Sequence, residues 1–191
     1  MRRILTAAVL IMLLAIGQTQ AQTATYDLTL KVGATKISGS PWDGIPGLGG
    51  TRANINGAPD PAVCIVQATG KPQCLWKPQG RRLLSICQNT QTCRFQSVQL
   101  PSLPIGLLFI DIDARSHDLI DIVVLTGNAT AVGETDIEIA LRSAIETLTP
   151  ALSEAAKERG LHTARKLPLQ QCTSTAGCKL TQSEFRLEPR K

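Results

Sequence analysis

The stretch "LLFIDIDARSHDLIDIVVLTG", residues 107–127, decides how this chain is interpreted. Two apolar runs flank a short polar segment. Four aspartates lie in or beside that segment: Asp111, Asp113, Asp118 and Asp121. An apolar run that ends in closely spaced carboxylates is typical of a strand that delivers charge to a loop. Like charges this close repel one another unless water or a cation screens them. The stretch therefore predicts two strands joined by a loop that holds a cation.

The spacing of the aspartates favours calcium. Asp111 and Asp113 are two residues apart at a strand end, so strand periodicity points them the same way. Asp118 can return from the other side of the loop, and three carboxylates can then converge. Calcium takes about six to eight oxygen ligands in irregular geometry, whereas magnesium demands a stricter octahedron. The alternative is that Asp111 and Asp113 only solubilise a loop end. His117 is a poor calcium ligand and is expected to face solvent.

The chain before this stretch also has β-type patterning. Residues 26–37 alternate apolar and polar side chains, and residues 38–61 form a loop rich in Gly, Pro and Asn. Short apolar segments separated by turn signals then recur at regular spacing: 62–68, 72–77, 81–87, 93–100, 105–113 and 119–125. Many short strands at this interval predict a mainly β fold, an antiparallel sandwich over residues 22–127.

The periodicity changes beyond Gly127. Ile137, Leu141 and Ile145 recur at helical spacing, and Pro150 can kink or restart the helix. Residues 128–160 are therefore predicted to form a helical appendage at the C-terminal side of the sandwich. Residues 161–191 are predicted to be a polar tail tied by a disulfide.

The first residues indicate export. Residues 1–21 combine a basic start at Arg2 and Arg3, an apolar core over 4–16, and small residues that suit cleavage after Ala21. The apolar core is too short to span a bilayer. We therefore expect a signal peptide and a secreted or periplasmic mature protein.

The cysteines fit the same compartment. All six lie after residue 21: Cys64, Cys74, Cys87, Cys93, Cys172 and Cys178. An even number in an oxidising compartment predicts disulfides, and the spacings do not match a zinc site. Pairing of neighbours is the default, namely Cys64 with Cys74, Cys87 with Cys93 and Cys172 with Cys178. Other connectivities stay open from sequence alone.

The formal net charge is +5, and its distribution is uneven. Residues 71–94 contain no acidic residue and five basic ones: Lys71, Lys77, Arg81, Arg82 and Arg94. Such a run is either a solvated strand face or a surface for anions such as lipid head groups. With three Phe, two Trp and one Tyr, the chain has little aromatic material to stack bases, so nucleic acid is not an expected partner.

A second acidic motif extends the candidate site. The stretch "PDPAVCIV", residues 59–66, holds Asp60 between two prolines that fix the backbone. Followed by residues 107–121, it resembles the C2 domain, a calcium-dependent membrane-targeting β-sandwich, over roughly residues 26–127. The resemblance implies that Asp60, Asp111, Asp113 and Asp118 are calcium ligands. It implies a fifth ligand at Asp43, or Asn54 in its place.

The chain departs from the C2 pattern: Ala62 replaces a tyrosine, Asp121 replaces a glycine, the first loop carries an insertion, and the last loop is one residue short. In that family, calcium neutralises an acidic loop cluster and bridges to lipid phosphates. We therefore expect an exported calcium-binding module that targets an anionic membrane surface or an envelope protein. The alternative is a calcium-independent, disulfide-stapled sandwich with a structural or interaction role. No Gly-x-Ser-x-Gly or His-Glu-x-x-His motif occurs, so we expect neither an enzyme nor a small-molecule substrate.

Overall fold

The computed structural model describes residues 23–42, 57–79, 82–112, 117–127 and 134–190. These residues form a mainly β fold with two sheets, as the sequence predicts. One sheet has the order β5-β1-β10-β9 and consists of β1 (Ala24–Val32), β5 (Thr92–Leu100), β9 (Cys178–Lys179) and β10 (Ser183–Pro189). The other has the order β4-β3-β2-β6-β7-β8 and consists of β2 (Pro61–Val66), β3 (Gln73–Gln79), β4 (Arg82–Ser85), β6 (Ile105–Ile112), β7 (His117–Thr126) and β8 (Arg165–Pro168). The helices are α1 (Glu134–Leu148), α2 (Glu154–Thr163) and α3 (Leu169–Cys172).

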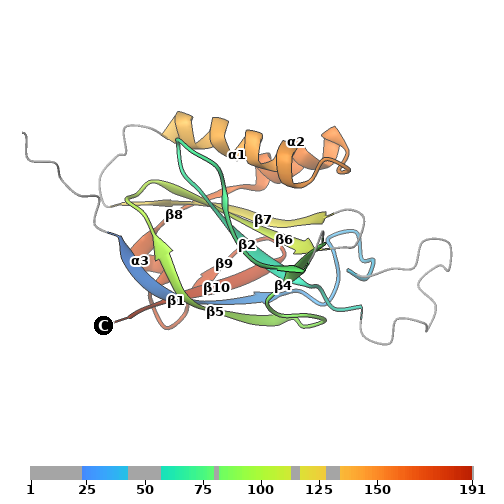
Figure 1. Cartoon of the computed structure of the whole chain (residues 1–191), viewed down its shortest axis with the longest axis horizontal. Coiled ribbons are helices and arrows are strands. Elements are labelled where there is room, and N and C mark those ends of the chain that lie inside the picture. The colour runs from blue at the N-terminus through green and yellow to red at the C-terminus, as the bar shows by residue number, and fades with distance from the viewer. Residues whose placement is uncertain (1–22, 43–56, 80–81, 113–116, 128–133, 191) are drawn as a thin grey trace, which may run out of the picture.

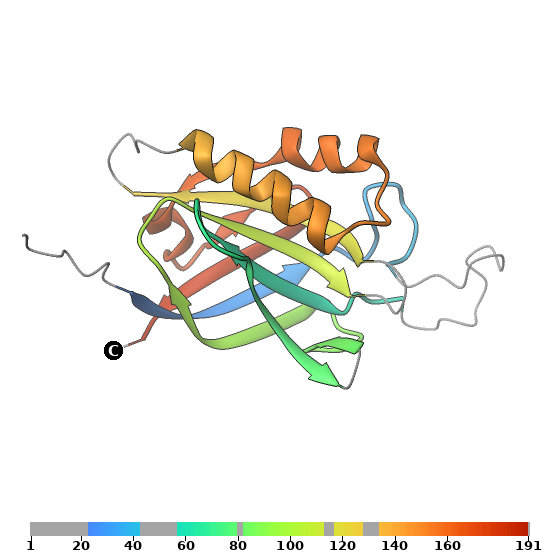
Figure 2. The same ribbon diagram turned by 45° about the horizontal axis from the view of Figure 1, so that its top comes forward.

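The molecule has three layers (Figure 1). The four-stranded sheet faces the six-stranded sheet, and α1 and α2 lie on the outer face of the six-stranded sheet, as the turned view also shows (Figure 2). Strand β6 is therefore buried on both faces along its whole length. This explains why β6 reads as a nearly continuous apolar run instead of an alternating one.

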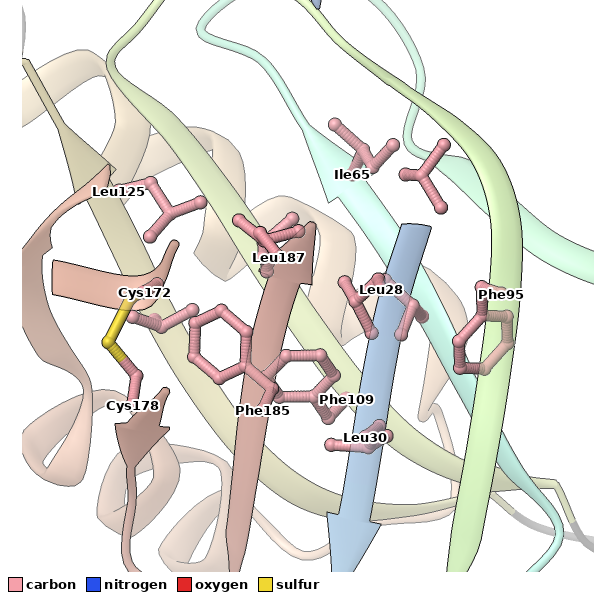
Figure 3. Close-up of a cluster of buried hydrophobic side chains, with 14 of the residues drawn as sticks. Leu28, Leu30, Ile65, Phe95, Phe109, Leu125, Cys172, Cys178, Phe185 and Leu187 are labelled. Carbon is pink, nitrogen blue, oxygen red and sulfur yellow. A yellow bond between two sulfur atoms is a disulfide. The ribbon is translucent and has the colours of Figure 1, made fainter. Parts of the chain in front are cut away.

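Alternating side chains build the core between the sheets. Leu28 and Leu30 of β1 point inward opposite Leu187 and Phe185 of β10, while the intervening residues face out. Phe185 contacts Phe109 of the facing sheet, with ring centroids 5.3 Å apart. Figure 3 shows these side chains meeting between the two sheets.

A second apolar cluster lies under the helices. Ile137, Leu141 and Ile145 of α1 follow one another at helical spacing, and they pack onto the outward side chains of β2, β6 and β7. Helix α1 ends where Pro150 cannot continue its hydrogen bonding, and α2 starts at Glu154. Helices therefore form in the predicted region, although α2 runs past residue 160. They are not a C-terminal appendage, because further strands follow them in the chain.

The C-terminal segment differs from the tail that the sequence predicts. After α2 the chain forms β8, α3, β9 and β10, and β10 lies between β1 and β9 in the four-stranded sheet. Phe185 and Leu187 enter the core, while Glu184 and Arg186 alternate with them on the outer face. The polar composition of this segment reflects one solvent-facing side of a strand.

The three predicted disulfides are confirmed. Cys64 and Cys74 face each other directly in the β2–β3 pair, with their Cα atoms 3.9 Å apart. The pairs Cys87–Cys93 and Cys172–Cys178 each join residues six positions apart. Three disulfides are compatible with an extracellular or periplasmic location. The predicted signal peptide lies outside the described residues.

Candidate functional site

Strand register brings three of the predicted ligands to one end of the sheets. Asp111 of β6 pairs with Pro61 of β2 on one side and with Asp118 of β7 on the other. Asp60 directly precedes Pro61, so these carboxylates come from neighbouring backbone positions on three adjacent strands. We call this end, defined by Lys36, Asp60, Asn89, Asp111 and Asp118, the loop end. The predicted ligands Asp43 and Asp113 and the alternative Asn54 lie outside the described residues.

Asp60 and Asp111 are held by backbone contacts. Asp111 is fully buried, and its Oδ1 accepts a hydrogen bond from the Asp60 N–H at 2.6 Å. The carbonyl of Asp60 in turn accepts the Ile112 N–H at 3.0 Å. The Asp60 carboxylate accepts the Asn89 N–H at 2.5 Å, from the loop that the Cys87–Cys93 disulfide closes. These two aspartates therefore join β2, β6 and the β4–β5 loop.

Asp118 has a different kind of partner. Its Oδ2 forms a salt bridge with the Lys36 ammonium, and both side chains are about one quarter exposed, 27% for Asp118 and 26% for Lys36. The Lys36 ammonium also lies 5.8 Å from the centroid of the Trp42 ring, within the range of a cation–π contact. A cation thus already sits beside one of the predicted calcium ligands.

A chain of hydrogen bonds positions Lys36. The Lys36 N–H donates to the Ser40 carbonyl at 2.9 Å, which closes a tight turn after β1. The next backbone N–H, that of Ile37, donates to the Gln182 side chain at 2.7 Å. Gln182 also donates from its side-chain amide to the Ile120 carbonyl of β7 at 2.6 Å. The turn is therefore fixed relative to β7, which carries Asp118.

Asp121, the fourth aspartate of the stretch, binds groups of the other sheet. It is buried, and its carboxylate accepts the Gln182 N–H at 2.8 Å and the Ser183 hydroxyl at 2.7 Å. Burial raises the pKa of Asp121, although the hydrogen bonds from Ser183 and the nearby backbone oppose that shift. This carboxylate ties β7 to the β9–β10 loop of the other sheet, which gives a structural reason for an acidic residue at this departure from the C2 pattern.

His117 is not simply solvent-facing, in contrast to the sequence expectation. Its ring lies 6.3 Å from the Trp76 ring, centroid to centroid, and its Nδ1 atom is buried with no hydrogen-bond partner among the described residues. Burial lowers the pKa of His117, while the neighbouring Asp118 raises it by a smaller amount. The imidazole is therefore biased toward its neutral form.

The five basic residues do not form one described surface. Lys71 is exposed in the β2–β3 turn, and Lys77 and Arg82 belong to the β3–β4 hairpin, whereas Arg81 lies outside the described residues. Arg94 is on β5 of the other sheet, where it pairs with Asp27 at 3.1 Å and with a glutamate of β10. Strand β5 pairs with β1, so Arg94 is separated from the hairpin by the fold.

A cleft of about 230 Å³ opens beside the loop end. Its walls come from the turn after β1, the start of β7, helix α2 and the β9–β10 loop. The lining includes Lys36, Trp42, Asp118, Arg159 and Gln182. The sequence pointed to Asp118 only. Lys36 gives no sequence signal, because it reads as an ordinary polar position of a strand. Trp42 could have been singled out, because a tryptophan is unusual inside a Gly- and Pro-rich loop.

The donor types at the loop end suit a hard cation, but their present contacts limit it. Among the residues that the structure describes, no group of three or more His, Cys, Asp or Glu side chains is arranged to hold a metal ion. Two carboxylates accept backbone N–H groups and the third faces an ammonium.

Comparison with known proteins adds no relative. No protein-family model, curated protein or solved structure matches the chain. Within the described part of the chain, the helices are too short or too polar to cross a bilayer.

Proposed function

We propose that the chain is an exported C2-like calcium-binding module with a sandwich fold. The observation that supports the proposal is the register that aligns Pro61, Asp111 and Asp118, because it gathers carboxylates from three adjacent strands at the loop end. Asp60, Asp111 and Asp118 would hold the ion together with Asp43 and Asp113, and calcium accepts such an oxygen-rich set.

Calcium would change the charge that the loop end presents. In the absence of the ion, the aspartates give this end a negative field that repels an anionic surface. A bound divalent cation neutralises part of this charge and so weakens the repulsion. The proposed target is an anionic membrane surface or an envelope protein. The candidate anion contacts are Lys71 in the β2–β3 turn and two basic residues of the β3–β4 hairpin, Lys77 and Arg82.

Calcium titration by calorimetry on the exported, disulfide-bonded protein tests the proposal. Asp118→Asn removes one predicted ligand without touching the buried Asp60–Asp111 contact. Asp136→Asn removes an exposed carboxylate from α1 and is the matched control. We expect calcium to bind and to raise the melting temperature of the wild type and of the control, and to do neither in Asp118→Asn. Equal binding by all three proteins would contradict the assigned site.

A second candidate function is a calcium-independent interaction protein with the same fold. The contacts that favour it are the Lys36–Asp118 salt bridge and the backbone use of Asp60 and Asp111. In this case the wild type would not bind calcium at millimolar concentration. Co-sedimentation with vesicles of anionic or neutral lipid, with and without calcium, separates the targets.

A further inference from the structure

We infer that the cleft beside the loop end binds a small apolar molecule that ends in a carboxylate. All the residues that line this cleft belong to the described part of the chain, and the inference is independent of the proposed calcium function. Three properties of the cleft support it. Its walls are fixed by the fold, it offers apolar surface to solvent, and its lining contains a cation that no described carboxylate neutralises.

The first property is that hydrogen bonds and close packing hold the walls in place. The Trp42 indole N–H donates to the Gly33 carbonyl at 2.8 Å, which closes the turn after β1, and Gln182 joins this turn to β7. On the other side, α2 lies directly on β7, because a Cβ at Gly160 would overlap the end of the Leu119 side chain. Binding therefore needs little ordering of the chain, which favours affinity for a small molecule.

The second property is apolar surface within the cleft. Ile37 lines it and is 75% exposed, although it is a large aliphatic side chain. Leu152 and Ala156 line the wall that α2 provides, and both are only partly buried. A ligand with an apolar body would remove these side chains from water, which is favourable. An apolar cavity of about 150 Å³ holds a benzene molecule, so a cleft of about 230 Å³ has room for about nine heavy atoms.

The third property is the charge of the lining. Asp118 pairs with Lys36, and Asp121 accepts hydrogen bonds from the β9–β10 loop, so both carboxylates of the cleft are engaged. Arg159 also lines the cleft, and its exposed side chain forms no salt bridge with a described carboxylate. A guanidinium binds a carboxylate through two parallel hydrogen bonds. One arginine balances one negative charge, so a monocarboxylate fits better than a phosphate monoester, which carries nearly two.

Calorimetric titration of the exported, disulfide-bonded protein with small carboxylates tests the inference. Phenylacetate is the aryl probe and octanoate is the alkyl probe, and phenylacetamide is the matched neutral control. The buffer contains a calcium chelator, so the result does not depend on the proposed calcium site. We expect at least one carboxylate to bind with a Kd in the millimolar range or below, and phenylacetamide to bind about fivefold more weakly than phenylacetate.

Two pairs of variants locate the binding site. Ala156→Leu fills the cleft and should abolish binding, whereas Ala155→Leu places the same side chain at an exposed position of α2 outside the lining and should bind as the wild type does. Arg159→Gln removes the cation and should weaken carboxylate binding about fivefold, the effect of an exposed ion pair. Arg159→Lys keeps the charge and should lose less affinity. Thermal melts without ligand show whether each variant is folded.

Each outcome supports or overturns the inference. Binding that Ala156→Leu abolishes, Ala155→Leu retains and Arg159→Gln weakens supports it. The inference is wrong if the wild type binds neither carboxylate at millimolar concentration, or if Ala156→Leu leaves binding unchanged. Equal affinity for phenylacetate and phenylacetamide would also overturn it, because the cation would then have no part in recognition. Arg159 is exposed, so Arg159→Gln keeps the test decisive if Ala156→Leu does not fold.

Discussion

Replacing Gly106 by alanine should destabilise the protein, because α1 lies closer to β6 than a Cβ atom allows. A Cβ at position 106 would stand 2.7 Å from Leu141 Cδ2 and 2.9 Å from Leu141 Cγ. Contacts this short force a shift. Leu141 is 1% exposed and packed between α1 and the six-stranded sheet, so it has little room to rotate.

The magnitude follows from two opposing effects. Overpacking a filled core costs about 1–3 kcal/mol. Alanine also restricts the unfolded chain, which returns about 0.4–1 kcal/mol. The net loss should be about 1–2 kcal/mol, which lowers the melting temperature of a domain this size by about 2–8 °C.

Thermal and denaturant unfolding with intact disulfides measures this loss. Gly127→Ala is the matched control, because a Cβ there meets no atom within 4 Å and φ is not positive, so its stability should be unchanged or slightly higher. In a Leu141→Ala background the clashing atoms are gone, and Gly106→Ala should then cost almost nothing. If Gly106→Ala costs as much in that background as in the wild type, the close approach of α1 to β6 is not the cause.

Lys157→Met should lower the melting temperature by a few degrees, because the buried ammonium joins glutamates of α1 and α2, and the difference from wild type should shrink in high salt. Melts at two ionic strengths check this. Because burial raises the pKa of Asp121 above its ordinary 3.8, the folded protein keeps a proton that the unfolded chain releases, so its contribution to stability falls as pH rises through the folded pKa. Melts across this pH range should therefore show a smaller decline for Asp121→Asn, and parallel profiles would refute the assignment. Gly177→Ala should destabilise more than Gly39→Ala in denaturant unfolding. Both glycines have positive φ, an alanine strain of about 1–2 kcal/mol, but only Gly177 would place a Cβ 2.6 Å from the Phe185 carbonyl oxygen.

The sequence predicted the parts of the fold that local pattern controls. The strands around Asp111 and Asp118 could be read because apolar runs and turn residues are short-range signals. The disulfides could be paired because cysteines a few residues apart meet when a hairpin or a tight loop forms. Cys64 and Cys74 illustrate this, since they lie directly opposite each other on paired strands.

The C-terminal strands could not be read in the same way. The apolar positions Phe185 and Leu187 alternate with charged residues, which is a strand signal, but the segment is short and rich in charge. Its partner β1 lies at the opposite end of the chain, and such long-range pairing leaves no local mark. Burial of Phe185 against Phe109 becomes visible only when both sheets are assembled.

The sequence predicts which carboxylates lie near one another, and it does not predict what they contact. Spacing indicates which carboxylates can converge, and the structure brings Asp60, Asp111 and Asp118 to one end. Spacing does not indicate which carboxylate oxygens already accept hydrogen bonds or form salt bridges. That depends on Asn89 and Lys36, which come from loops elsewhere in the sequence.

At the loop end, backbone hydrogen bonds and a side-chain salt bridge hold different carboxylates. The hydrogen bond from the Asp60 N–H to Asp111 joins β2 to β6. The loop that the Cys87–Cys93 disulfide closes adds a second contact, from the Asn89 N–H to Asp60. Freeing an oxygen there would break one part-buried and one exposed hydrogen bond from a backbone N–H. Exchanging the Lys36 ammonium on Asp118 for a metal ion breaks no backbone hydrogen bond. We therefore expect Asp118→Asn to test the proposed calcium site without loosening the backbone contacts between β2 and β6.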